Sequence, residues 1–362
     1  MRYNAIQRLP SSDNAIHRRL GLTACTYVKA RSLLAQLQRR WFLLALLAVM
    51  LLGYTQAEPL AALADAGWLR NCIVATVMFV MALPLSIEAM ARSVTNPVPL
   101  LLAVAMNVVA VPLAAVALYG PMNFYSNDFA NGLLIVGATP CTLASAAVWT
   151  RRAGGNDAVA LMVTVATNLG CFVVSPLVML LTAGKQAETE VVNFWAMATK
   201  LLLLVVAPMI LGQLLRLHQG AADWAAKRKT MLGVVAQIGI LMMVTLGSIG
   251  AGREMGGDLS RLLGPAVAVM AVLVVVIHVG VLLAGILLAK AARQSRADQI
   301  AVGIAGSQKT LMIGLQMSAS YFPGTLAMLP LIAYHAGQLL ADTLIVDWWR
   351  KQGDAASEEA TG

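Results

Sequence analysis

The sequence of 362 residues is poor in charged and aromatic side chains. Only 12% of its residues are charged and only 6% are Phe, Trp or Tyr. A soluble domain carries about 25% charged residues, so this composition excludes a soluble enzyme, a disordered chain and a fibrous repeat. Hydrophobic residues, chiefly Leu, Val, Ala and Met, make up 59%, and the mean hydropathy is +0.75. These values predict a polytopic helical membrane protein that has the lipid bilayer as its partner.

Motifs for catalysis and for nucleotide binding are also missing. The cysteines Cys25, Cys72, Cys141 and Cys171 lack metal-ligand spacing, and residues 1–40 contain no secretory signal peptide. There is no Gly-rich phosphate loop and no pair of carboxylates in the middle of an apolar segment. We therefore expect neither an enzyme nor a resident cofactor. We attribute the net charge of +9 to cytoplasmic loops and not to nucleic-acid binding.

Ten apolar segments have the length and composition of membrane-spanning helices. They cover residues 41–55, 72–91, 97–119, 129–150, 157–183, 191–215, 231–250, 262–289, 299–320 and 325–347. With the N-terminus inside, 20 of the 26 Lys and Arg residues are cytoplasmic, four are external and two lie within spans. This bias predicts an inner-membrane protein with both termini in the cytoplasm. We expect a basic extension at 1–40, a ten-helix domain at 41–350 and a disordered cytoplasmic tail at 351–362.

Two of these spans contain residues that a membrane helix normally excludes. In the fourth span, Pro140 lies near the middle among three hydroxyl side chains. In the ninth span, the run GSQKT (306–310) places Lys309 about ten residues from either end. If the chain is divided into 41–184 and 190–350, the interruptions fall at matching places in halves of opposite orientation. That arrangement favours a secondary transporter built from inverted repeats.

Six segments resemble one known family. They are PLSIEAMARSVTNP (84–97), NVVAVP (107–112), TPCTLASAAVWTRRAGGNDAVALMVTVATN (139–168), VVAPMILGQLLR (205–216), AGSQKTLMIG (305–314) and LPLIAYHAGQLL (329–340). Together they are similar to the bile acid:sodium symporter family, in its divergent SBF-like branch, over residues 41–350. The resemblance implies ten transmembrane helices in two inverted five-helix repeats. It further implies a panel domain (spans 1, 2, 6 and 7), a core domain (spans 3–5 and 8–10) and broken, crossing helices 4 and 9.

The resemblance also implies transport of an amphipathic organic anion by alternating access, with sodium as the candidate cation. The family's cation ligands correspond to Asn107, Ser145 and Gln308, whereas its asparagine after the serine is Ala146 and its acidic residue is Ile304. The expected cation-site region comprises Asn107, Thr139, Thr142, Ser145, Thr164, Thr167, Asn168, Gln308 and Lys309. The candidates for the substrate cleft are Pro140, Ser307, Thr310, His335 and Gln237.

Lys309 stands where the resembling family has a neutral residue. The acidic residues Glu88, Asp157, Asp342 and Asp347 are expected near span ends, too far away to neutralise it. In one hypothesis its ammonium replaces the sodium ion, and in another it carries the coupling proton. In a third, sodium binds the remaining oxygens and the lysine faces the substrate. A lysine that merely snorkels or holds helices together is the structural alternative.

Two further polar residues lie within apolar spans. We interpret Lys200 as a snorkelling side chain and His278 as a hydrogen-bond partner between helices. The leading interpretation is a sodium-coupled organic-anion carrier, or one in which Lys309 replaces the sodium. The alternatives are a proton-coupled carrier, a channel, an intramembrane enzyme and a regulatory membrane protein that transports nothing.

Overall fold

The structure is a computed structural model that describes residues 41–85, 96–143, 145–182, 193–262 and 264–361. The described residues form helices and contain no strand. The chain divides into compact units at 1–48 and 49–362, and the first is described only from the start of α3 (Trp41–Thr55). The predicted extension 1–40 and Glu88 lie outside the described residues.

Six helices are long and apolar enough to cross a membrane. They are Pro97–Ala117, Asp157–Thr182, Phe194–Arg216, Lys229–Met255, Pro265–Ala291 and Met328–Arg350. Of two shorter apolar helices, α3 has the bounds of the first predicted span, and α5 (Gly67–Ala82) overlaps the second, which we predicted at 72–91. A helix satisfies its own backbone hydrogen bonds, which the bilayer interior requires. The prediction of a polytopic all-helical membrane protein is therefore confirmed.

Two spanning helices each contain one π-helical turn. The segments are α7 (Pro97–Ala105), η3 (Met106–Ala110) and α8 (Val111–Ala117) in one helix, and α13 (Phe194–Leu201), η4 (Leu202–Val206) and α14 (Ala207–Arg216) in the other. Pro112 and Pro208 lie just after these turns. Since proline has no N–H and its ring crowds the preceding turn, a wider turn accommodates it and leaves a carbonyl without its usual donor.

Each segment predicted to be interrupted consists of two helices. The pairs are α10 (Asn127–Ala138) with α11 (Ala146–Arg152), and α18 (Arg296–Ser307) with α19 (Leu311–Tyr321). Thr139 is extended, with φ −74° and ψ 150°, as expected for a residue that precedes a proline. Gln308 is extended too, with φ −74° and ψ 139°, although no proline follows it. Side chains from other helices must therefore stabilise the second break.

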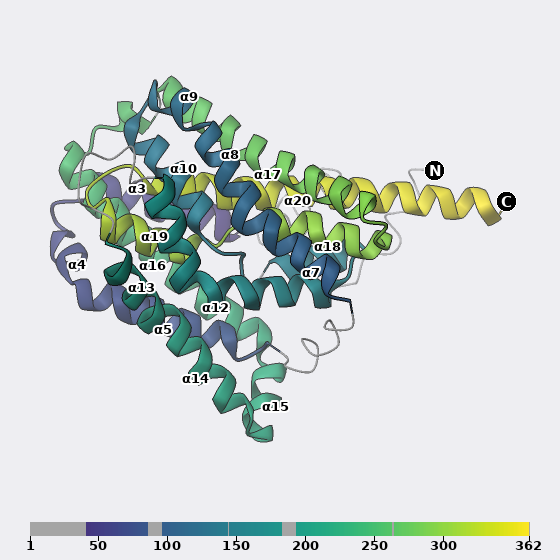
Figure 1. Cartoon of the computed structure of the whole chain (residues 1–362). Coiled ribbons are helices and arrows are strands. Elements are labelled where there is room, and N and C mark those ends of the chain that lie inside the picture. The colour runs from purple at the N-terminus through teal and green to yellow at the C-terminus, as the bar shows by residue number, and fades with distance from the viewer. Residues whose placement is uncertain (1–40, 86–95, 144, 183–192, 263, 362) are drawn as a thin grey trace, which may run out of the picture. The chain divides into compact units, whose positions relative to one another are not determined.

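The remaining helices complete two packed groups. They are α4 (Ala61–Asp65), α9 (Tyr119–Asn123), α12 (Asp157–Thr182), α15 (Gln219–Lys227), α16 (Lys229–Met255), η5 (Leu259–Leu262), α17 (Pro265–Ala291) and α20 (Met328–Thr361). In one group, α5 packs against α14 and α16. In the other, α17 packs against α18 and α20, and α12 packs against α7 and α18 (Figure 1). Contacts of α12 with α13 and of α16 with α19 join the groups.

The C-terminal tail differs from the expectation. Helix α20 continues to Thr361, through residues that we predicted to be disordered. The segment AASEEA (355–360) is rich in Ala and Glu, which have high helix propensity, so the helix extends beyond its apolar part. The prediction of disorder over these residues was therefore wrong.

Candidate functional site

The ammonium of Lys309 lies in a cage of oxygen atoms where the two broken segments meet. Its Nζ donates to the carbonyl of Asn107 (2.7 Å), to Asn107 Oδ1 (3.2 Å), and to the carbonyls of Gly137 (3.0 Å) and Thr139 (2.7 Å). The side chain is only 2% exposed. We call these four oxygens the oxygen cage. An ammonium has three donors, so four acceptors at these distances saturate it.

Local backbone geometry explains why these carbonyls are available. In η3, the N–H of Val111 bonds to the carbonyl of Met106, and Pro112 has no N–H to offer. The carbonyl of Asn107 thus lacks its ordinary backbone donors. Gly137 and Thr139 lie at the C-terminal end of α10, where carbonyls have no intrahelical partner and the helix dipole is negative. Both features attract a positive charge.

The second break is held by two amide side chains. Gln338 of α20 accepts from the backbone N–H of Lys309 (2.9 Å) and donates to its carbonyl (3.0 Å). Asn107 Nδ2 donates to the carbonyls of Gln308 (2.9 Å) and Ala305 (3.3 Å). These bonds satisfy the backbone where α18 ends, so residue 308 can be extended without a proline.

A buried chain of side chains continues from the break to α17. Ser145 donates to Gln308 Oε1 (2.7 Å), and Gln308 Nε2 donates to Asp342 Oδ2 (2.5 Å). The other carboxylate oxygen of Asp342 lies 2.9 Å from His278 Nε2, and both residues are fully buried. His278 therefore bonds α17 to α20, as predicted for a partner between helices.

The placement of Asp342 corrects the expectation for this residue. We expected it near a span end, but it is fully buried and accepts a hydrogen bond from Gln308, the residue that precedes Lys309. The sequence did contain a signal. His335, Gln338 and Asp342 are spaced by three and four residues and so form one polar stripe on a helix.

Polar residues of α12 support the first break. Thr164 Oγ1 donates to the carbonyl of Thr142 (3.1 Å), Thr167 Oγ1 accepts from the N–H of Cys141 (3.1 Å), and Asn168 Nδ2 donates to the Cys141 carbonyl (2.7 Å). Three hydroxyl and amide side chains thereby replace the helical bonds that residues 141 and 142 lack.

All nine residues expected in the cation-site region belong to one connected hydrogen-bond network. Ala144, which is next to Ser145, lies outside the described residues. Of the cleft candidates, Pro140 accepts from the N–H of Thr310 (2.9 Å), which joins the two breaks directly. Ser307 is buried, and its carbonyl accepts from Tyr334 (2.7 Å).

The other two cleft candidates are separated from each other. His335 is buried and bonds to Gln338 (3.1 Å). Gln237 is half-buried on α16, and no described contact links it to the network. The sequence thus pointed to the network around Lys309 but not to Gln338, Asp342 or Tyr334, which the packing of α20 brings in.

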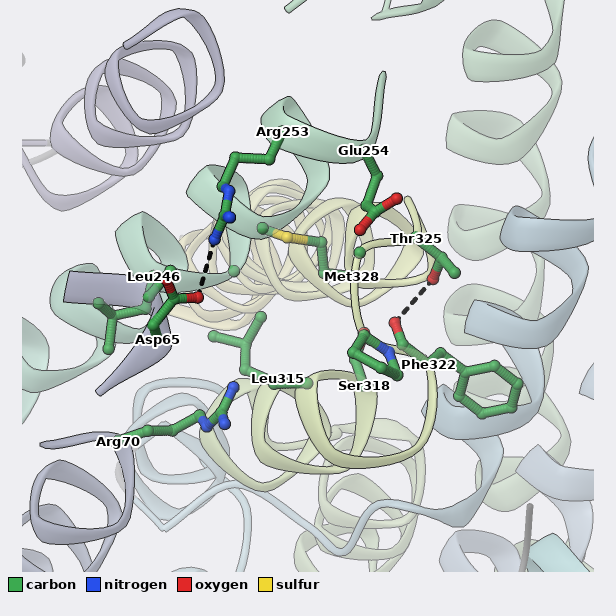
Figure 2. Close-up of a pocket in the computed structure, with 16 residues that line it drawn as sticks. Asp65, Arg70, Leu246, Arg253, Glu254, Leu315, Ser318, Phe322, Thr325 and Met328 are labelled. Carbon is green, nitrogen blue, oxygen red and sulfur yellow. Dashed lines mark hydrogen bonds and ion pairs between the residues drawn. The ribbon is translucent and has the colours of Figure 1, made fainter. Parts of the chain in front are cut away.

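Two larger cavities lie between the helix groups. Cavity 1, of about 430 Å³, is lined by the C-terminal part of α16, by Arg70 at the start of α5 and by α19. Figure 2 shows Arg70 and Glu254 on opposite sides of it, with the ion pair of Arg253 and Asp65 (2.8 Å) at its rim. Their side chains are 39% and 65% exposed, so the rim reaches the surface.

Cavity 2, of about 320 Å³, lies at the opposite ends of the same helices α5 and α16. Its lining is mostly aliphatic and includes Leu143 and Ala147, on either side of Ser145. Lys229 and the ion pair of Arg151 with Asp157 complete it. Each cavity therefore contacts one of the two interrupted segments, and each combines apolar walls with charged groups.

Two interrupted membrane helices that meet at a buried polar network are a feature of secondary transporters. Comparison with known proteins agrees. The chain belongs to the SBF-like CPA transporter family, whose model matches residues 40–351. The predicted resemblance to the SBF-like branch is therefore confirmed.

Two relatives illustrate the match. The chain is 25% identical over 333 residues to a protein of Rattus norvegicus named sodium/bile acid cotransporter 7, covering 87% of this chain and 93% of the relative. It is 29% identical over 299 residues to the uncharacterized protein PA2026 of Pseudomonas aeruginosa, covering 80% and 87%. The family and these names indicate a transporter related to the sodium/bile acid cotransporters.

Proposed function

We propose that this protein is a secondary active transporter that carries an amphipathic organic anion across the inner membrane without sodium, because the Lys309 ammonium occupies the cation position. The observation that carries the proposal is the oxygen cage, in which one buried nitrogen has four oxygen acceptors at 2.7–3.2 Å. Carbonyl and amide oxygens of this kind are what a transported cation would bind. Here they are already occupied by a cation that is part of the chain.

Electrostatics oppose a second cation at the same place. Two unit charges about 5 Å apart repel by roughly 3 kcal/mol at an effective dielectric constant of about 20. Asp342 is the one acidic residue linked to the network among the described residues, and it already bonds to His278 and Gln308. A sodium ion near the cage would therefore lack a free carboxylate.

We further propose the mechanism of alternating access. The ten spans would form two inverted repeats, with both termini in the cytoplasm and a core that contains both broken helices. The positions of cavities 1 and 2 at opposite ends of α5 and α16 support this arrangement. Movement of the core against α5 and α16 would open one cavity while it closes the other.

The test is counterflow of labelled carboxylates and sulfonates in liposomes that contain the purified protein. We expect equal uptake in sodium and in choline media, and loss of uptake in Lys309→Met. A requirement for sodium would overturn the assigned role of Lys309 and favour binding of sodium at the remaining oxygens. Uptake driven by a pH gradient would favour the proton-coupled alternative instead. If no organic anion exchanges at all, the transport proposal itself fails.

A further inference from the structure

Two basic side chains away from the oxygen cage have no acidic partner among the described residues. They are Arg70 of α5 and Lys200 of α13, and Lys200 is joined through Ser320 and Gln316 to Asn71, the residue next to Arg70. Among the described residues, neither forms an ion pair. Lys200 Nζ donates to the hydroxyl of Ser320 on α19 (2.8 Å), whereas Arg70 Nε is buried and has no hydrogen-bond partner. Both side chains are half-buried, and an anion at this place would supply the partner that the Arg70 Nε lacks.

The neutral groups between these two cations are also incompletely bonded. Gln316 of α19 is 1% exposed, and its Nε2 lies 3.3 Å from Asn71 Oδ1 and 3.4 Å from the hydroxyl of Ser320. Its Oε1 has no partner. We call Arg70, Asn71, Lys200, Gln316 and Ser320 the basic wall. The wall contains donors that are not fully used and no carboxylate.

The basic wall adjoins a space large enough for a small organic ion. Arg70 lines cavity 1 together with Ser318 and Ala319, which precede Ser320 on α19. The second arginine of this cavity, Arg253, is already paired with Asp65 (2.8 Å). Glu254 lies on the opposite side from Arg70 (Figure 2), so an anionic group in the cavity is repelled there and attracted to the wall.

We infer that the basic wall is a recognition site for a carboxylate or sulfonate group, which Arg70 and Lys200 bind from the cavity 1 side. The planar guanidinium of Arg70 can donate two parallel hydrogen bonds to such a group, and the ammonium of Lys200 supplies the second charge. The hydroxyl of Ser320 and the amide of Gln316 would complete the contacts. The identification of this group as part of the transported solute rests on the proposed function, but the binding itself does not.

The test is the thermal stability of the purified full-length protein in detergent, titrated with benzoate and with benzenesulfonate. Ligands that bind the folded state raise the apparent melting temperature, so the shift reports the dissociation constant. Arg70→Gln should raise that constant at least about tenfold, because a hydrogen bond to a charged group is lost. Lys200→Gln should weaken binding as well. Since the side chain of Arg70 has no hydrogen bond or ion pair with another described residue, Arg70→Gln should melt normally without ligand.

The matched control is Arg253→Gln, which removes the same charge from the same cavity at a residue that is already paired. It should change the dissociation constant by no more than about twofold relative to the unsubstituted protein, because only a distant and screened charge is lost. Equal weakening by the two variants, equal stabilisation by neutral benzamide, or an unchanged constant in Arg70→Gln would each overturn the site. Binding without counterflow would leave the site in place and refute the transport proposal. Counterflow that Arg70→Gln does not change, together with no binding of either anion, would refute the site and leave the transport proposal in place.

Discussion

At the scale of single residues, the centre of the protein is organised by side chains that replace missing backbone partners. The ammonium of Lys309 bonds to carbonyls at the end of α10, and Asn107 bonds to carbonyls at the end of α18. Each helix interruption exposes backbone groups that the bilayer cannot hydrate. Polar residues in these spans therefore have a structural task besides the function proposed for them, so a substitution there can change stability as well as transport.

Gln338 offers a test of this structural task that leaves Lys309 itself unchanged. Gln338→Leu removes both bonds to the backbone of Lys309 and leaves a buried N–H and a buried carbonyl unpaired. Each unpaired group costs about 1–3 kcal/mol, so the melting temperature in detergent should fall clearly. Gln237→Leu is the control, because this half-buried residue has no described hydrogen bond and should change stability by less than about 0.5 kcal/mol. Equal melting of the two variants would contradict the role given to Gln338.

Residues near the centre differ in how far the sequence could predict them. Lys309 and Pro140 could be recognised because each violates a local rule for membrane helices. Asp342 could not be assigned by its distance from a span end, since its burial depends on how α20 packs against α17 and on where the second break places Gln308. The pairing of His278 with Asp342 joins residues 64 positions apart, which no local pattern encodes.

At the scale of helices, the breaks and the close contacts between helices set the positions of the polar groups. Both breaks could be predicted from the sequence, because a proline in one apolar segment and a charged residue in another mark their positions. The π-helical turn at Asn107 was not predicted, although Pro112 five residues later was its cause. Small residues decide how closely the helices around these breaks approach, and this can be tested directly.

Gly303 of α18 lies where α18 meets α17. A Cβ there would lie 2.8 Å from the carbonyl oxygen of Leu282 and 2.7 Å from Ile286 Cγ1, so Gly303→Ala should force the helices apart. We expect a loss of about 1–3 kcal/mol of stability, as for other overpacked interiors, and reduced counterflow. Gly280→Ala, on α17, meets no atom within 4 Å and should be neutral or stabilising by up to about 1 kcal/mol. Similar melting temperatures for the two variants would show that this contact does not limit the helix spacing.

At the scale of the whole molecule, the two cavities at opposite ends of the same helices allow the proposed carrier to be tested against a channel. A channel keeps one polar path open from side to side, whereas alternating access exposes the cavities in turn. Ala319 lines cavity 1 and Ala147 lines cavity 2, and both are half-buried alanines on the second helix of an interrupted segment. They form a matched pair of positions for measuring exposure from each side of the membrane.

The experiment introduces Ala319→Cys or Ala147→Cys into a chain in which Cys25 and Cys72 are serine. Cys141 and Cys171 are buried and can stay. Membrane-impermeant maleimide is applied to vesicles of either orientation, with and without an anion that shows counterflow. We expect each cysteine to react from one side only, and the anion to raise the reactivity of one while it lowers that of the other. If both cysteines become more reactive together, or if either reacts equally from both sides, the protein has an open path, and alternating access is excluded.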